Sequence, residues 1–313
     1  MSTPTKTAPP LEIELAPWQF EIGGVVLGTG TPVPVGNVEG LGSPATRPQD
    51  VDNPAGDGTY PGRDFYGPRT IRMEAGIKTP GDPTAAADLL ACLELALDDP
   101  AARTRPEGRA VLRGRWPGHR TRRLYGRLRR MEATNTTNAI NGWIPLDIEF
   151  AALDPRWHDD ELSQLTLRLD QAATHEPDSR SISAPLCAPT DCDRADPDDR
   201  PGWITNRGNV SAWPSLRVHG PVSHPRIWNT VTRRVLELGL SLRAGEWVEM
   251  ETRPGTRWAL RNGTVNVAGD LTPESRLDHF TIPKGRSEIG WSADDPTGTG
   301  RLEVSWRSAY TAL

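Results

Sequence analysis

Residues 234–250 read RVLELGLSLRAGEWVEM, and this stretch decides the fold of the second half of the chain. Its apolar residues mostly alternate with other residues, at Leu236, Leu238, Leu240, Leu242, Val248 and Met250. A period of two predicts β-strands with one buried face. Between Asn206 and Leu313 similar runs recur about every 8–12 residues, which is typical of a sandwich of roughly 100 residues. They include Leu216/Val218, Trp258/Leu260, Ile289/Trp291 and Leu302/Val304/Trp306, and turns such as Pro254-Gly255, Asn262-Gly263 and Thr297-Gly298 separate them.

The first half of the chain also predicts antiparallel strands. Residues 18–27, WQFEIGGVVL, are typical of a hairpin that turns at Gly23-Gly24. Alternating patterns predict four further strands, over residues 69–77, 110–116, 124–129 and 144–150. With 30 Pro and 30 Gly, the chain is rich in turns, which favours a mainly β architecture.

One amphipathic helix is expected, over about residues 83–98. Asp82 offers an N-cap, and Pro83 suits the first helical position. The apolar stripe that follows comprises Leu89, Leu93, Ala96 and Leu97. Cys92 lies in this pattern, and we interpret it as a small buried apolar residue.

We expect two domains and a linker: an N-terminal domain over residues 1–170, a linker over 171–202, and the sandwich over 203–313. The linker segment is polar, rich in Pro and without periodicity. Residues 28–66 are rich in Gly and Pro, and loops longer than about 12–15 residues are usually functional or disordered. Two interpretations of this range stay open, an extended arm that becomes ordered against a neighbouring subunit and a plain surface loop.

Charge and hydropathy exclude some classes of protein. The 313 residues carry a formal net charge of −5, whereas a free nucleic-acid-binding protein is usually basic. The sequence contains no apolar run of about 18 residues, so no membrane span is predicted. The start, MSTPTKTAPPLEIEL, lacks the apolar core of a signal peptide, so we expect synthesis in the cytosol and no membrane insertion.

Eleven arginines lie between Arg103 and Arg130. Four of them occupy the polar faces of predicted strands: Arg113, Arg115, Arg127 and Arg129. Cross-strand ion pairs with Asp147 and Glu149 would use these charges. A contact between subunits and a nucleic-acid patch are the other interpretations.

No catalytic, cofactor or metal site is expected. The six His show no metal-binding spacing, and the glycines at Gly23-Gly24 and Gly28–Gly30 lack the Lys-Ser/Thr of a phosphate-binding loop. Cys187 and Cys192 lie in a polar loop with only His175 nearby, too few ligands for zinc.

The chain contains eleven tryptophans, and core packing is the default expectation for those in strand patterns. Trp116, Trp258, Trp291 and Trp306 sit in strand patterns, so core packing is expected for them. Trp203, Trp213 and Trp228 lie near turns and are the candidates for exposed aromatic contacts. Exposed indoles could stack on sugar rings, which leaves a carbohydrate-binding module for attachment to a host surface as the alternative function.

Several short motifs resemble one known family. The run from Phe150 to Trp157, FAALDPRW, resembles a strand-ending "A-x-DPR-aromatic" motif of minor tail proteins of long-tailed phages, in particular the distal tail protein (Dit) group of actinobacterial phages. The second half is similar at PRIWN (225–229), at the Ala244-Gly245 turn, and at the closing Val304-x-Trp306. The order of hairpin, long arm, strand, helix and strands also resembles this group.

The resemblance implies a structural role without catalysis. Such proteins form a ring, generally a hexamer, where the tail tube meets the tip. The N-terminal domain continues the tube and leaves a channel for the tape-measure protein and for DNA in transit. The C-terminal domain is galectin-like and holds further tip proteins or touches the host surface. The implied partners are other copies of the chain, the tail-tube protein, the hub and other minor tail proteins, and the implied location is the virion tail tip.

Overall fold

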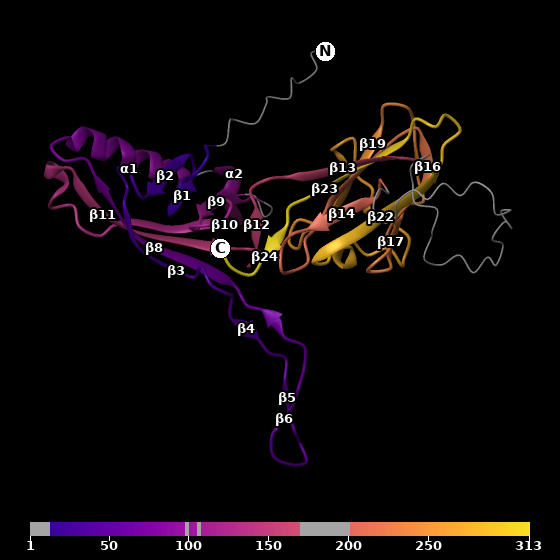
Figure 1. The fold of residues 1–313 in the computed structure, drawn as a ribbon, viewed down its shortest axis with the longest axis horizontal. Coiled ribbons are helices and arrows are strands. Elements are labelled where there is room, and N and C mark those ends of the chain that lie inside the picture. The colour runs from indigo at the N-terminus through magenta and orange to yellow at the C-terminus, as the bar shows by residue number, and fades with distance from the viewer. Residues whose placement is uncertain (1–12, 98–99, 105–107, 170–200) are drawn as a thin grey trace. The chain divides into compact units, whose positions relative to one another are not determined.

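The computed structural model describes residues 13–97, 100–104, 108–169 and 201–313 (Figure 1). The fold is mainly β, as predicted. It divides into two compact units, Met1–Asp160 with Ala312–Leu313 as the first and Glu161–Thr311 as the second. None of the described helices is long and apolar enough to cross a bilayer.

The first unit is built on an antiparallel sheet with the strand order β2-β1-β9-β10-β11-β8-β3, and β12 also pairs with β10. The strands are β1 (Gln19–Ile22), β2 (Val25–Gly28), β3 (Val35–Glu39), β8 (Arg69–Lys78), β9 (Ala110–Arg115), β10 (Arg122–Ala133), β11 (Trp143–Ala152) and β12 (Trp157–Asp159). The predicted hairpin is confirmed: Ile22 pairs with Val25 across the turn at Gly23-Gly24. The alternating apolar faces of β8 and β11 are buried, from Ile71 to Ile77 and from Ile144 to Phe150.

Helix α1 (Pro83–Leu97) packs on this sheet against β8, β10 and β11. Its start is the predicted one, since the carboxylate of Asp82 accepts a hydrogen bond from the Ala85 amide at 2.9 Å. Ala86 and Leu93 are buried. The interpretation of Cys92 as buried was wrong: the thiol is exposed, because position 92 lies about 100° around the helix from Leu93. The short elements α2 (Pro100–Arg103) and η1 (Ala139–Asn141) complete the helical content of the described part of this unit.

Residues 28–66 form two different structures. β3 joins the sheet beside β8, whereas the segment from 46 to 66 forms a narrow two-stranded ribbon (Figure 1). In this ribbon β4 (Thr46–Arg47) pairs with β7 (Phe65–Tyr66), and β5 (Val51–Asp52) pairs with β6 (Thr59–Tyr60). We call residues 46–66 the arm.

The second unit is a β-sandwich. One sheet has the order β13-β23-β15-β19-β20-β21, and the other has the order β14-β22-β16-β17 with β18 paired to β16. Side chains of both sheets share one core, among them Val218 and Val304 of the first sheet and Ile227 and Trp291 of the second. The sandwich strands are β13 (Ser163–Arg168), β14 (Trp203–Asn206), β15 (Ser215–His219), β16 (Val222–Asn229), β17 (Arg234–Glu237), β18 (Ser241–Leu242), β19 (Trp247–Glu251), β20 (Trp258–Arg261), β21 (Val265–Asn266), β22 (Gly285–Asp294) and β23 (Arg301–Trp306). The unit also contains the short strand β24 (Ala309–Tyr310), which belongs to neither of these sheets, and the short helices η4 (Ala268–Asp270) and η5 (Leu277–His279).

The boundaries of the units differ from the expected domains at both ends. Strand β13 falls within the range 1–170, yet it pairs along its length with β23 of the second unit. Ala312–Leu313 groups with the first unit, where the Leu313 amide donates to the Leu41 carbonyl at 3.1 Å. The linker predicted over 171–202 lies outside the described residues except for its last two positions.

Two details of the sandwich pattern also differ. The four leucines from Leu236 to Leu242 are buried as expected, but they do not share one strand. β17 ends at Glu237, and the Gly239 amide donates instead to the Asp270 carbonyl at 2.8 Å. In β20 the buried residue is Ala259, and Trp258 is only half-buried, because Ala259 lies opposite the buried Met250 of β19 and shares its face.

Candidate assembly surfaces

The arginines predicted to lie on a polar strand face include a buried ion network. Arg113 is 6% exposed; its guanidinium contacts the Asp160 carboxylate at 2.6 Å and Glu21 at 3.1 Å, and donates to the Ile13 carbonyl at 2.9 Å. Arg123 lies on the other side of Asp160 at 2.7 Å. Burial alone would raise the pKa of Asp160, but the hydrogen bonds and charges of the two arginines together hold that pKa below its usual value. Arg113 is therefore an internal residue of the first unit and not an accessible subunit contact.

The other three predicted contact arginines have different surroundings. Arg115 donates to the Leu15 carbonyl at 2.7 Å and pairs with Glu14 at 3.3 Å. Arg127 makes a long contact, 3.4 Å, with the Gly108 carbonyl. Arg129 is exposed and is the extra residue of a β-bulge, since the register of β10 against β11 shifts between Leu128 and Arg130.

Because of this bulge, Asp147 and Glu149 form their ion pairs with arginines other than the predicted ones. After the shift, Arg130 lies opposite Glu149, and its guanidinium reaches Asp147 at 3.2 Å and Glu132 at 2.6 Å. Glu149 pairs with Arg72 of β8 at 3.6 Å. The cross-strand pairing with Asp147 and Glu149 is thus present, but Arg130 and Arg72 supply the cations.

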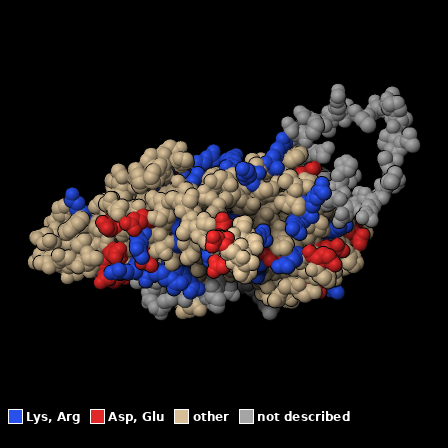
Figure 2. All heavy atoms as spheres, turned by 90° about the horizontal axis from the view of Figure 1, so that it is seen from below, with Lys and Arg blue, Asp and Glu red and all other residues tan. Residues whose placement is uncertain are grey.

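The charged residues of β8, β10 and β11 give this part of the sheet a polar face. It carries both cations and anions. Figure 2 shows Lys and Arg side chains interspersed with Asp and Glu side chains on the side of the molecule that it presents. We call this set the charged face: Arg72, Glu74, Lys78, Arg127, Arg130, Glu132, Asp147 and Glu149. Such a surface has no broad field of one sign that would attract a polyanion.

The arm presents apolar side chains to solvent. The exposed fractions are 63% for Val51, 58% for Tyr60, 46% for Phe65 and 42% for Tyr66. Two paired strands without a packed face are marginally stable alone in water. Exposed apolar side chains gathered on one ribbon are typical of a surface that another protein chain covers.

A buried arginine fixes the root of the arm. Arg69 is 3% exposed and donates to the carbonyls of Gly40 at 2.5 Å and Gly42 at 2.6 Å, and to the Pro155 carbonyl at 2.8 Å. Burial lowers the pKa of Arg69 to about 10, and the charge of Asp154 partly offsets that effect. Arg69 thereby joins the DPRW run to the point where the arm leaves the sheet.

The DPRW run itself is structural. Asp154 accepts a hydrogen bond from the Arg156 amide at 3.2 Å and contacts the His158 imidazole at 3.3 Å, and Trp157 is fully buried. Sequence reasoning missed Arg69 as a member of this cluster. The signal was present, because Arg69 has the same strand phase as the buried Ile71 and Met73.

Of the three tryptophans predicted to be exposed, one is buried. Trp228 is only 3% exposed, because it lies in the middle strand β16, where its indole covers Gly290 of β22. Trp203 and Trp213 are half-buried. The Arg286 guanidinium lies over the Trp203 ring at 4.5 Å from its centroid, a cation–π contact that already occupies one ring face.

Within the described part of the chain, no three His, Cys, Asp or Glu residues group closely enough to hold a metal ion. Cys187, Cys192 and His175 lie outside the described residues. His158 and Asp159 are buried within β12 rather than presented to a cation.

The architecture, a β-rich unit with one long helix followed by a β-sandwich, is similar to that of solved phage tail proteins. Among solved structures, the chain is similar to the Dit protein of phage SPP1, described as a hub of the adsorption apparatus in phages that infect Gram-positive bacteria, with a TM-score of 0.58 and 11% identity. That match covers 93% of this chain and 98% of that one. No protein-family model matches the sequence, and no curated protein matches it.

Chains of the phage P2 baseplate are also similar. In the activated conformation with calcium, and likewise with strontium, the TM-score is 0.52 and the identity is 10%. Each match covers 92% of this chain and 97% of the other. At these identities the likeness concerns the fold, and it extends over both units.

Proposed function

We propose that this chain is a structural protein of a phage tail tip, in which copies of it, six in number, close into a ring that joins the tail tube to the tip complex. The single observation that carries the proposal is the shared fold, since a hub protein and baseplate chains match over more than nine-tenths of this chain. The likeness includes both units and their order, which a shared sandwich alone would not produce.

The arm supports a contact between copies. A closed ring uses head-to-tail interfaces, in which one surface of a subunit meets a different surface of the next. Stable interfaces bury above about 1,000 Å² in total. The arm, fixed at its root by Arg69 and exposing four large apolar side chains, can supply much of that area by lying along the neighbouring subunit.

The charged face supports a role as channel wall. Its ion pairs, Arg130 with Asp147 and Arg72 with Glu149, balance positive against negative groups. DNA and the tape-measure protein would meet a wall that holds neither of them tightly. The tail-tube protein, the hub and other minor tail proteins would be the remaining partners, with assembly in the host cytoplasm and a final position in the virion tail.

The carbohydrate-binding alternative needs accessible ring faces of tryptophan. Trp228 is buried, and Trp203 has a guanidinium over its ring. Both observations favour a structural role over sugar binding by stacking on these two rings.

Native mass spectrometry of the purified chain tests the ring. Six copies of the 34.3 kDa chain give about 206 kDa, and this mass is expected. The double substitution Tyr60→Ser, Phe65→Ser removes apolar area from the arm and should shift the population to monomer. Replacing Ile140 and Val265, which are 77% and 56% exposed and lie outside the arm, by Ser is the control and should leave the ring intact. Two results would contradict the proposal. One is that the unsubstituted chain stays a monomer even when the tail-tube protein is added, and the other is that both variants lose the ring equally.

A further inference from the structure

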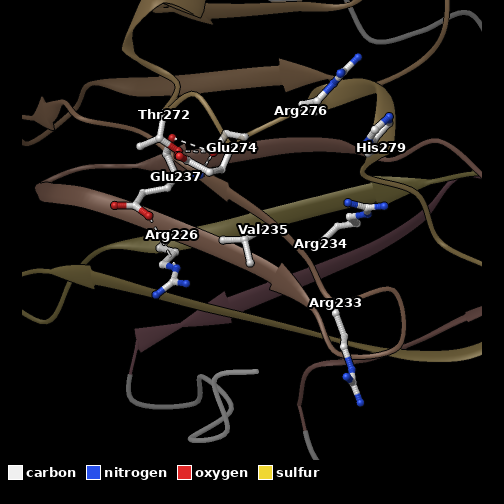
Figure 3. A pocket seen from close by; sticks show the side chains of 10 residues that line it. Arg226, Arg233, Arg234, Val235, Glu237, Thr272, Glu274, Arg276 and His279 are labelled. Carbon is white, nitrogen blue, oxygen red and sulfur yellow. Dashed lines mark hydrogen bonds and ion pairs between the residues drawn. The ribbon is translucent and has the colours of Figure 1, made fainter. Parts of the chain in front are cut away.

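A concave pocket of about 320 Å³ opens on the second unit beside β17, the last strand of its sheet (Figure 3). Five basic side chains line it: Arg226 of β16, Arg233 and Arg234 at the β16–β17 turn, and Arg276 and His279 from the segment that follows Leu271. Figure 3 shows these groups distributed around Val235 and contributed by separate parts of the chain. The function proposed above makes no use of this pocket.

The two walls of the pocket are tied together. The Thr272 amide donates to the Glu237 carbonyl at 3.1 Å, and the Glu237 amide donates to the Ser275 hydroxyl at 2.8 Å. The hydroxyl groups of Thr272 and Ser275 are hydrogen-bonded at 2.8 Å. Because these bonds fix the 272–275 segment along the edge of β17, the pocket is formed before any ligand arrives.

The turn that presents Arg233 is held in an unfavourable conformation. Arg233 has φ of +54°, in the left-handed region that side-chain-bearing residues rarely adopt. The fully buried Asn229 imposes it: its side-chain oxygen accepts from the Val231 amide at 2.9 Å and the Thr232 amide at 3.2 Å, and its carbonyl accepts from the Arg233 amide at 2.8 Å. Glycine would relieve this strain, so an arginine here is typical of a functional position.

Positive charge in the pocket exceeds negative charge. Four arginines and two carboxylates, those of Glu237 and Glu274, line it, in a chain whose net charge is −5. Glu237 lies 3.7 Å from Arg226, and Arg276 is held by the carboxylate of Asp278 at 2.8 Å. Arg233 and Arg234 are exposed, and neither has an ion-pair partner among the described residues.

We infer that this pocket binds a phosphate-bearing group, such as a phosphorylated polyol or sugar. The planar fork of a guanidinium matches phosphate oxygens, and several arginines around one pocket suit a group with three acceptor oxygens and close to two charges. Among the described residues that line it there is no Trp, Tyr or Phe on which a neutral sugar could stack. The volume is at the lower end of about 300–1,000 Å³ that small-molecule sites occupy, enough for a single phosphorylated unit.

Equilibrium dialysis of the full chain against radiolabelled glycerol 1-phosphate, at constant ionic strength, tests this inference. Saturable binding of one molecule per chain is expected. Inorganic phosphate should compete, whereas glycerol should not. The double substitution Arg233→Gln, Arg234→Gln should weaken binding by about tenfold or more, because it removes two charged donors. The matched control is Arg168→Gln, Arg207→Gln, which removes the same charge from exposed positions of the same unit and should change binding less than about twofold.

Three results would overturn the inference. Absence of saturable binding up to several millimolar is the first, and equal weakening in the control variant is the second. The third is competition by glutarate as strong as that by phosphate, which would assign the pocket to a carboxylate-rich segment of another protein. If the double variant fails to fold, Arg234→Glu alone provides the same comparison. Dialysis measures binding per chain whether or not the chain forms a ring. A negative binding result and a failure to observe the ring are therefore separate outcomes.

Discussion

Replacing Asp160 by Asn removes the carboxylate that lies between Arg113 and Arg123 inside the first unit. The two arginines are 6% and 7% exposed, so the substitution leaves two buried cations without their shared anion. Removing one partner of a buried ion pair costs about 3–5 kcal/mol. Arg113 keeps Glu21 and the Ile13 carbonyl, so we expect a loss near the lower value, about 3 kcal/mol in the free energy of unfolding.

The loss depends on pH in a defined direction. The folded-state pKa of Asp160 is lower than its unfolded value of about 3.9, so the folded state favours the ionised carboxylate. Its stabilising contribution is fully present above the unfolded pKa and disappears as the pH falls through the folded pKa. The difference between the unsubstituted chain and Asp160→Asn should therefore be constant near pH 7 and shrink in acid below about pH 4.

Urea unfolding, read by hydrogen exchange of peptides from β9 and β10, measures this difference for the first unit alone. The matched control is Asp147→Asn, whose carboxylate pairs with the half-exposed Arg130 and should cost at most about 1 kcal/mol. A loss below about 1 kcal/mol for Asp160→Asn at pH 7 would refute the buried network as a source of stability. A loss that stays the same at pH 7 and in acid would refute the assigned pKa shift.

Three other substitutions test the packing and the arm. Gly290→Ala should destabilise the sandwich by about 1–3 kcal/mol in thermal unfolding, because its Cβ would lie 2.5 Å from the indole of Trp228; Gly269→Ala has open space and should cost far less. Asp82→Ala should cost about 1 kcal/mol by loss of the helix cap, and a neutral result in urea unfolding would contradict that role. Arg69→Met should speed amide exchange in the arm and its root, at 40–47 and 65–68, without comparable change in α1; unchanged exchange there would show that the arm root does not depend on this guanidinium.

Local patterns predicted those parts of the fold that depend on neighbouring residues in the sequence. The buried faces of β8 and β11, the β1–β2 hairpin and the capped start of α1 each follow from alternation, a Gly-Gly turn or an Asp-Pro pair. The positive φ angles of Gly23 and Gly24, +58° and +85°, are the reason that the turn needs glycine, and a Cβ at position 23 would also collide with Ala96 of α1.

The features that sequence did not predict depend on contacts between distant segments. The bulge at Arg129 changes which arginine reaches Asp147, and no pattern within β10 marks it. The pairing of β20 with β19 decides which side chains of β20 face the core, and it buries Ala259 in place of Trp258. The burial of Trp228 depends on the space left by Gly290, more than 60 positions later in the chain. The basic pocket likewise combines Arg226 with Arg276, which no spacing rule connects.

Cryo-electron microscopy of the intact virion whose genome encodes this chain tests the structural role most directly. The account predicts a closed ring of six copies where the tail tube meets the tip, with the arm of each copy against its neighbour and an open channel along the axis. Density at that junction into which neither unit fits, or a tip without any ring of this fold, would contradict it.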